Sequence, residues 1–117
     1  MANRWMLYGA YGYTGRLIAA EAVKRGMRPV LAGRREKPLR SMAEDLDLEY
    51  RVLRVDEREE LAGGLEGFDL VLNCAGPFAR TAPPMIAACI AAGTHYLDIT
   101  GEIEAFRHAH ERDDEAR

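Results

Sequence analysis

The sequence predicts an α/β fold, namely a doubly wound parallel sheet of about five strands with flanking helices, stacked as αβα layers. Two observations predict it. Short apolar segments alternate with helix-forming segments along the whole chain, which is typical of parallel sheets built from βαβ units. The first apolar segment runs directly into the turn Gly-Ala-Tyr-Gly-Tyr-Thr-Gly at positions 9–15. A glycine turn between the first strand and the first helix is characteristic of a Rossmann-like fold.

The first half of the chain predicts two strands, each followed by a helix. The expected elements are a strand at 4–8, a helix at 16–25, a strand at 29–32 and a helix at 36–46. Small residues at Gly15, Ala19 and Ala22, together with Val23, form one narrow face of the first helix, and Gly26 ends it. The second helix carries apolar residues at helical spacing, which are Leu39, Met42, Ala43 and Leu46.

The second half continues the same alternation. We expect a strand at 50–55, a helix at 57–65 ended by glycines, a strand at 69–74, a further helix, a strand at 95–99 and a charged helix at 102–117. The segment 69–74 is nearly continuously apolar, which predicts a central strand covered on both faces. In the helix that follows it, Thr81 can act as the cap, Pro83 and Pro84 fit the first turn, and Gly93 ends the helix.

Composition and charge exclude several classes of function. The 117 residues have the size of one domain, and a net charge of −3 with interspersed signs predicts no nucleic-acid partner. We expect no membrane association and a cytoplasmic location, because the sequence shows neither a long apolar window nor a signal-peptide layout. Cys74 and Cys89 are expected to be reduced thiols. His108 and His110 are two residues apart, unlike helical metal ligands, so we expect no metal site.

The glycine turn predicts a bound dinucleotide. Gly9, Gly12 and Gly15 would allow a tight turn, close approach of a pyrophosphate and close packing of the new helix on the sheet. The amides at the helix N-terminus would then face the phosphates. Glycines at this spacing also occur in ordinary turns, but the strand before and the helix after them favour the nucleotide site.

The end of the second strand predicts which dinucleotide binds. NAD-binding domains generally place an acidic residue there to bind the ribose 2′-hydroxyl, whereas this chain has Gly33-Arg34-Arg35. A guanidinium can bind a 2′-phosphate in a bidentate manner, so we expect NADP(H), with Arg34 as first choice and Arg35 as second. The alternative is a pair of solvated arginines.

The ends of the third and fourth strands supply further candidates. Small residues in the segment Asn-Cys-Ala-Gly-Pro at 73–77 would let a ribose or the nicotinamide pass close to the backbone, while Asn73 offers hydrogen bonds. The same segment also reads as a polar strand end before a proline turn. Asp56 is a weaker candidate for the adenine side.

Four ordered motifs resemble the saccharopine dehydrogenase-like oxidoreductases, in the branch that includes the trans-acting enoyl reductases. The motifs are Gly-Ala-Tyr-Gly-Tyr-Thr-Gly, Ala-Gly-Arg-Arg, Asn-Cys-Ala-Gly-Pro-Phe and Tyr-Leu-Asp-Ile-Thr-Gly-Glu. The resemblance implies that residues 1–117 are an NAD(P)-binding Rossmann-like domain, and that the family's substrate and dimerisation domain is absent from this chain.

The resemblance also implies the residues that bind the cofactor. They are Gly9, Ala10, Gly12, Tyr13, Thr14 and Gly15 for the pyrophosphate, Arg34 and Arg35 for the 2′-phosphate, and Asn73, Ala75, Gly76 and Pro77 beyond. The chain departs from the family pattern at Tyr11, where relatives usually carry a small hydroxyl residue. Its ring would either fold over the cofactor or point outward.

No catalytic residue is predicted. Asp98, Thr100 and Glu102 could meet a substrate, but Thr100 and Glu102 also suit the start of a helix. A tyrosine followed four residues later by lysine is absent, which argues against a short-chain dehydrogenase. We therefore expect hydride transfer to a small-molecule substrate that binds only with the missing domain. The alternatives left open are a non-catalytic NADP(H)-binding sensor or interaction module and, for either, a homodimer formed through exposed apolar edge surface.

Overall fold

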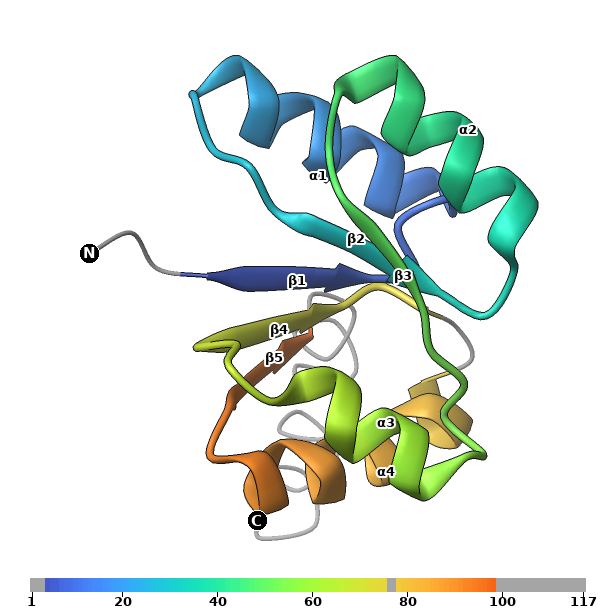
Figure 1. Ribbon diagram of the computed structural model, residues 1–117, viewed down its shortest axis with the longest axis vertical. Helices are drawn as coiled ribbons and strands as arrows, with labels where there is room; N and C mark the ends of the chain where they lie inside the picture. The colour runs from blue at the N-terminus through green and yellow to red at the C-terminus, as the bar shows by residue number, and fades with distance from the viewer. Residues whose placement is uncertain (1–3, 76–77, 99–117) are drawn as a thin grey trace, which may run out of the picture.

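A computed structural model describes residues 4–75 and 78–98, which form a parallel sheet with helices on both faces (Figure 1). Its five strands follow the order β3-β2-β1-β4-β5, and every neighbouring pair is parallel. The strands are β1 (Trp5–Tyr8), β2 (Val30–Gly33), β3 (Tyr50–Val52), β4 (Leu70–Asn73) and β5 (His95–Asp98). This confirms the predicted Rossmann-like doubly wound fold.

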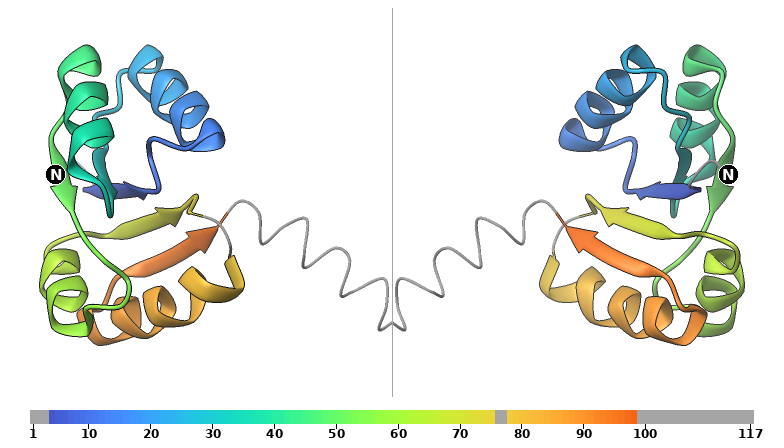
Figure 2. Two further views of the ribbon diagram at one scale, coloured as in Figure 1. Left: turned by 90° about the vertical axis from the view of Figure 1, so that its right-hand side faces the viewer. Right: turned by 90° about the vertical axis from the view of Figure 1, so that its left-hand side faces the viewer.

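The four helices lie in two pairs, one pair on each face of the sheet. They are α1 (Tyr13–Lys24), α2 (Glu36–Leu46), α3 (Arg58–Leu65) and α4 (Phe78–Ala92). Figures 1 and 2 show α1 and α2 on one face, over β1 to β3, and α3 and α4 on the other. This arrangement follows from right-handed crossovers, because the chain returns from β3, at one edge of the sheet, to β4 on the other side of β1.

The core consists of two apolar clusters on opposite faces of the sheet. Because side chains alternate along a strand, Met6 and Tyr8 of β1 pack in the cluster that includes Phe68 and Met85, while Leu7 packs on the other side. All of them are fully or nearly fully buried. The two clusters fix the sheet between its helices and hold the carboxyl ends of β1, β2 and β4 together at one edge.

The first helix begins three residues earlier than the sequence predicted. It starts at Tyr13 because Gly12, with extended backbone angles (φ −72°, ψ 169°), takes the N-cap position. Gly26 has a φ of +80° and ends the helix as expected. The helix therefore begins inside the glycine motif, and its first turn borders the carboxyl edge of the sheet.

Two glycines and two prolines lie elsewhere in their helices than predicted. Gly63 and Gly64 are inside α3 rather than at its end. Because α4 begins at Phe78, Thr81 does not cap it and Pro83 and Pro84 lie beyond its first turn. The Thr81 hydroxyl instead donates to the carbonyl of Ala75 at 2.7 Å. Gly93, with a φ of +72°, follows the last residue of α4 as predicted.

The most apolar strand is not the central one. β1 lies at the centre of the sheet, and β4 is next to the edge strand β5. Leu70 and Leu72 on β4 are only half-buried, because α1 and α2 do not extend over this part of the sheet. An open groove therefore runs along β4 and β5, lined in part by Trp5, Met27 and Leu97.

The ends of the predicted strands are trimmed by turns. The third strand stops at Val52 rather than at 55, since the Glu57 backbone amide donates to the carbonyl of Arg54 in a tight turn.

The expected helix at 102–117 lies outside the described residues. None of the described helices has both the length and the apolar character needed to cross a bilayer.

Candidate nucleotide-binding site

A cavity of about 230 Å³ lies at the carboxyl edge of the sheet, between the glycine turn and the ends of β2 and β4. It is lined by Tyr8, Gly9, Tyr11, Gly12, Gly33, Arg34, Val55, Cys74, Ala75, Arg80 and Thr81. The strand order reverses between β1 and β4, and such a switch point is where doubly wound sheets bind ligands. Small-molecule pockets commonly measure about 300–1,000 Å³, so this cavity encloses only part of a dinucleotide.

The glycine turn has the geometry that a nucleotide site requires. Gly9 has a φ of +78°, and an ideal Cβ there would come within 2.6 Å of the Ala75 amide nitrogen. At Gly15 an ideal Cβ would lie 2.5 Å from the Gly9 carbonyl oxygen. Gly9 thus permits the tight turn, and Gly15 permits close packing of α1 beneath it.

The N-terminus of α1 is suited to an anion. Its N-cap residue, Gly12, provides no side-chain hydrogen bond, and the first turn contains no acidic residue. The first amides of a helix have no partner within the helix and carry partial positive charge. A phosphate at this end would be held by backbone amides, so the exposed side chains of Tyr13 and Thr14 are not required for it.

Tyr11 lies inside the site rather than pointing outward. The half-buried ring packs on the backbone at the end of β2, where an ideal Cβ on Gly33 would lie 2.6 Å from the ring carbon Cε1. The Tyr11 carbonyl accepts a hydrogen bond from Arg16 Nε at 2.8 Å. Tyr11 therefore lines the same cavity as Arg34, at the position where the sequence departs from the family pattern.

The two arginines after β2 differ in position. Arg34 is exposed and lines the cavity, whereas Arg35 occupies the N-cap position of α2 and does not line it. Asp56, in the turn after β3, is exposed and outside the cavity lining. The geometry therefore separates the first-choice arginine from the second.

The end of β4 forms the opposite wall. Asn73 is fully buried, and its Oδ1 accepts a hydrogen bond from the Ala75 amide at 3.0 Å. Burial, followed by the negative charge of Asp98, raises the pKa of the Cys74 thiol to about 12. Cys74 is therefore protonated at neutral pH, which disfavours a nucleophilic role.

The structure brings together only part of the predicted set. Gly9, Tyr11, Gly12, Arg34 and Ala75 line one cavity. Seven other predicted residues, all among those described, do not line it, namely Ala10, Tyr13, Thr14, Gly15, Arg35, Asp56 and Asn73. Gly76 and Pro77 lie outside the described residues, as do Thr100 and Glu102.

The predicted cofactor-binding residues do not include six residues of the lining: Tyr8, Gly33, Val55, Cys74, Arg80 and Thr81. Arg80 and Thr81 are in the first turn of α4, so the proline turn before them was the available signal. Tyr8 is the last residue of β1 and is 2% exposed, with its hydroxyl donating to the Leu53 carbonyl at 2.8 Å. Burial raises the pKa of Tyr8 to about 12.

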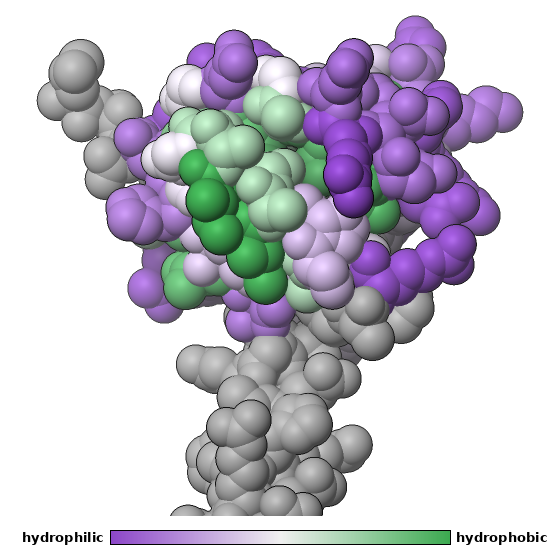
Figure 3. All heavy atoms as spheres, turned by 90° about the horizontal axis from the view of Figure 1, so that it is seen from below, coloured by the Kyte–Doolittle hydropathy of each residue, from purple (hydrophilic) through white to green (hydrophobic). Residues whose placement is uncertain are grey.

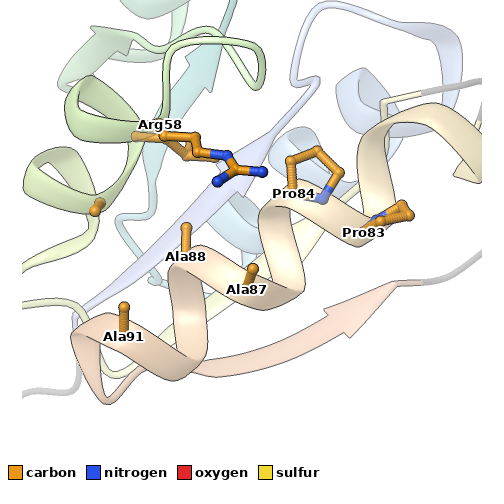
Figure 4. A pocket seen from close by; sticks show the side chains of 8 residues that line it. Arg58, Pro83, Pro84, Ala87, Ala88 and Ala91 are labelled. Atoms are coloured by element: carbon orange, nitrogen blue, oxygen red, sulfur yellow. The ribbon is translucent and has the colours of Figure 1, made fainter.

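A second groove lies between α3 and α4, away from the glycine turn (Figure 4). Its volume is about 450 Å³, and it is lined mainly by alanine and proline side chains of α4, with Arg58 of α3 reaching across toward Pro84. Figure 3, which views the molecule from below, shows a hydrophobic patch on its surface. Ile86 and Ile90 of α4 are 40% and 77% exposed. The groove shares no lining residue with the cavity and offers few polar groups to a nucleotide.

The described residues contain no group of His, Cys, Asp or Glu side chains that could hold a metal ion.

The strand order, the glycine turn and the uncapped helix N-terminus together define a dinucleotide-binding domain of the Rossmann type. The family follows from a comparison with known proteins, in which residues 5–117 match the family described as saccharopine dehydrogenase NADP binding domain. The chain belongs to this family, and its cofactor is NADP(H).

Individual relatives agree with this assignment. The chain is 36% identical over 107 residues to the trans-acting enoyl reductase of Mycobacterium tuberculosis, covering 84% of this chain and 25% of that protein. It thus spans about a quarter of the length of the curated relatives it matches.

Solved structures share the fold. Saccharopine dehydrogenase (L-Glu forming) from Saccharomyces cerevisiae superposes with a TM-score of 0.73 at 17% identity, over 83% of this chain and 21% of that one. The leucoanthocyanidin reductase of Vitis vinifera, solved as a binary complex with NADPH, superposes with a TM-score of 0.68 at 18% identity, over 80% of this chain and 35% of that one.

Proposed function

We propose that the chain is the NADP(H)-binding part of an oxidoreductase that transfers hydride between the nicotinamide and a small-molecule substrate. The relatives are reductases and dehydrogenases, which supports an oxidoreductase parent. In this proposal residues 1–117 are one cofactor domain, and the substrate pocket is supplied by a further domain of the parent protein. The cofactor brings the hydride chemistry, and this chain's residues bind and orient it.

One observation carries the cofactor assignment to particular residues. Arg34 and the glycine turn line the same cavity at the switch point of the sheet. We propose that the amides at the start of α1 hold the pyrophosphate and that Arg34 holds the 2′-phosphate. Tyr11, whose ring lies beside Arg34, would then pack against the adenosine half.

The first test is a calorimetric titration of this chain with NADPH and with NADH. We expect tighter binding of NADPH, and we expect Arg34→Ala to weaken NADPH binding by about 10- to 100-fold, as for a charge-assisted hydrogen-bonded pair. NADH, which lacks the 2′-phosphate, should bind the variant and the original chain alike.

Arg35→Ala is the matched control, because it removes the same charge one residue further along but outside the cavity. It should leave the preference for NADPH within about threefold of the original, since exposed charges contribute little. Equal losses in the two variants would show that only the general positive potential matters. Absence of binding to either cofactor would refute the proposed site.

A second candidate is a non-catalytic NADP(H)-binding sensor or interaction module. It is supported by the cavity lining, where the described residues include no carboxylate, histidine or lysine, and the acid–base groups are the buried Tyr8 and the half-buried Tyr11 and Cys74. Turnover by the complete gene product would exclude it. The cytoplasmic location stays a prediction.

We also propose that the chain self-associates through the edge of the sheet. β5 is the edge strand of the described sheet, and Leu97 on it is 55% exposed. Edge strands with exposed apolar side chains favour pairing with another chain. A second copy of this chain is the partner that this proposal names.

A further inference from the structure

A chain of hydrogen bonds links the ends of β4 and β5 behind the nucleotide cavity. Asn73 and Asp98 are register partners at the last position of the two strands, and Tyr96 lies two residues before Asp98 on the same face. The Asn73 amide nitrogen donates to the Tyr96 hydroxyl at 3.1 Å, and this hydroxyl donates to Asp98 Oδ2 at 2.8 Å. The Tyr96 hydroxyl thus joins the two strands.

The same chain of hydrogen bonds reaches the cavity wall from the other side. Asn73 also donates to the Thr81 hydroxyl at 3.2 Å, and Thr81 donates to the Ala75 carbonyl at 2.7 Å. The Ala75 amide donates back to Asn73 at 3.0 Å. Both backbone polar groups of Ala75 are therefore held by side chains of this network.

Ala75 is also the point of contact with the glycine turn. An ideal Cβ on Gly9 would fall 2.6 Å from the Ala75 nitrogen, so the two backbones touch, and both residues line the cavity. Because the contact leaves so little space, a shift of Ala75 by a fraction of an ångström would alter the cavity wall. The network therefore holds the backbone of one residue of the cavity wall.

The hydroxyl of Tyr96 is committed to this network. Burial raises its pKa above the ordinary value, and the hydrogen bond to Asp98 raises it further, while that from Asn73 lowers it. The phenol therefore remains protonated and acts as a donor toward Asp98. The second oxygen of Asp98, Oδ1, is buried and has no hydrogen-bond partner among the described residues, so the Tyr96 contact is the one that orients this carboxylate there.

We propose that Tyr96 is a positioning residue for the nicotinamide half of the cofactor, acting through Asn73 and Thr81 on the backbone of Ala75. This inference rests on the proposed function of the cavity. With the 2′-phosphate at Arg34 and the pyrophosphate at the start of α1, the nicotinamide half is the part that extends toward the end of β4. Tyr96 touches neither cofactor nor substrate in this proposal and acts only by placing Ala75.

The test compares a complete cofactor with its adenosine half. The 117-residue chain and its Tyr96→Phe variant are titrated with NADPH and with adenosine 2′,5′-bisphosphate. The substitution removes one hydroxyl and leaves Asn73 and Asp98 without their shared partner. We expect NADPH to bind about tenfold more weakly and adenosine 2′,5′-bisphosphate to bind unchanged.

Thr94→Val is the matched control. Thr94 is a buried hydroxyl residue just before β5, at the opposite end of the strand, and its Oγ1 donates to the Phe68 carbonyl at 3.0 Å. It lies in neither the cavity lining nor the network, so this variant should bind both ligands as the original chain does. A loss of NADPH binding in the control equal to that in Tyr96→Phe would overturn the proposal.

The remaining outcomes are distinct. Unchanged NADPH binding by Tyr96→Phe, or equal weakening of both ligands, would overturn the positioning role while leaving the proposed cofactor site intact. Failure of the original chain to bind either ligand would overturn the proposed function and this inference with it. If circular dichroism shows that Tyr96→Phe does not fold, Thr81→Val decides by the same criteria, because it removes the network's bond to the Ala75 carbonyl.

Discussion

At the residue scale, Tyr8 places a polar group inside the core without leaving it unpaired. Its side chain packs in the apolar cluster beneath the sheet, and its hydroxyl donates to the Leu53 carbonyl at 2.8 Å. Removing the hydroxyl would leave a buried carbonyl without this donor, which typically costs about 1 kcal/mol. The same burial makes Tyr8 a sensitive probe of the folded state at high pH.

The raised pKa of Tyr8 predicts a loss of stability in alkali. An unfolded tyrosine ionises near pH 10, whereas burial raises the pKa of Tyr8 in the folded chain to about 12. Its contribution is thus fully present below pH 10 and is lost as the pH rises toward 12, by up to about 3 kcal/mol. Tyr8→Phe should therefore lower the free energy of unfolding at pH 8 but reduce its fall between pH 10 and 12.

Urea denaturation of both proteins across this range is the measurement. Some slope will remain in the variant, because burial also raises the pKa of Cys89 to about 11, and of Cys74, with a further contribution from Asp98, to about 12. These thiols contribute from pH 9 upward. Parallel curves for the two proteins would contradict the assignment of the slope to Tyr8.

At the scale of single elements, α3 contains two adjacent glycines with opposite packing. At Gly63 an added Cβ would meet nothing within 4 Å, whereas at Gly64 it would lie 2.4 Å from a methyl carbon of Leu53. Neither has a positive φ. A Cβ at Gly64 would therefore need the side chain of Leu53, just after β3, to shift, whereas one at Gly63 would fit without any shift.

This difference predicts opposite effects of alanine. Gly63→Ala should raise the free energy of unfolding by about 0.5–1 kcal/mol, because alanine has the higher helix propensity and restricts the unfolded chain. Gly64→Ala should lose that gain or destabilise the chain, since Leu53 must move. Urea midpoints measure both, and an equal gain in the two variants would show that Leu53 moves aside freely.

The glycine turn and the elements around it follow from local sequence, and this part of the fold could be predicted. The spacing of Gly9, Gly12 and Gly15 encodes a turn in which Gly12 and Gly15 pack on Gly9 and Ala10, whereas the close contact of Gly9 with Ala75 depends on the sheet. The extent of α4 could not be read in the same way, because Thr81 looks like a cap in sequence but bonds to Ala75 in the structure. Nor could the apolar segment of β4 reveal that one of its faces lies open.

The residues of the candidate site also differ in how far local sequence could predict them. Arg34 could be predicted because it directly follows a strand that ends at the carboxyl edge. The sequence also ranked Arg34 before Arg35, and α2 begins at Glu36 as predicted, which leaves Arg35 at the N-cap and outside the cavity lining. Tyr96 escaped prediction because its role depends on the pairing of β4 with β5, which brings Asn73 within reach across 23 positions of sequence.

At the scale of the whole molecule, the helices among the described residues leave part of one apolar face of the sheet, along β4 and β5, uncovered. α1 and α2 lie over β1 to β3, and the groove along β4 and β5 includes the exposed side chains of Met27 and Leu97, 48% and 55% exposed. Burying such side chains against a second copy would be favourable by roughly 1.5–3 kcal/mol for each fully covered one. This is the surface on which the proposed self-association depends.

Sedimentation velocity over a range of concentrations tests this surface. The original chain should sediment faster as its concentration rises, and Leu97→Lys should sediment as a monomer throughout, because a charge on an edge strand opposes pairing. Leu17→Lys is the control: Leu17 is 56% exposed on α1 and does not line the groove, so this variant should associate like the original. A monomeric original chain would refute self-association, and equal behaviour of both variants would place the interface elsewhere.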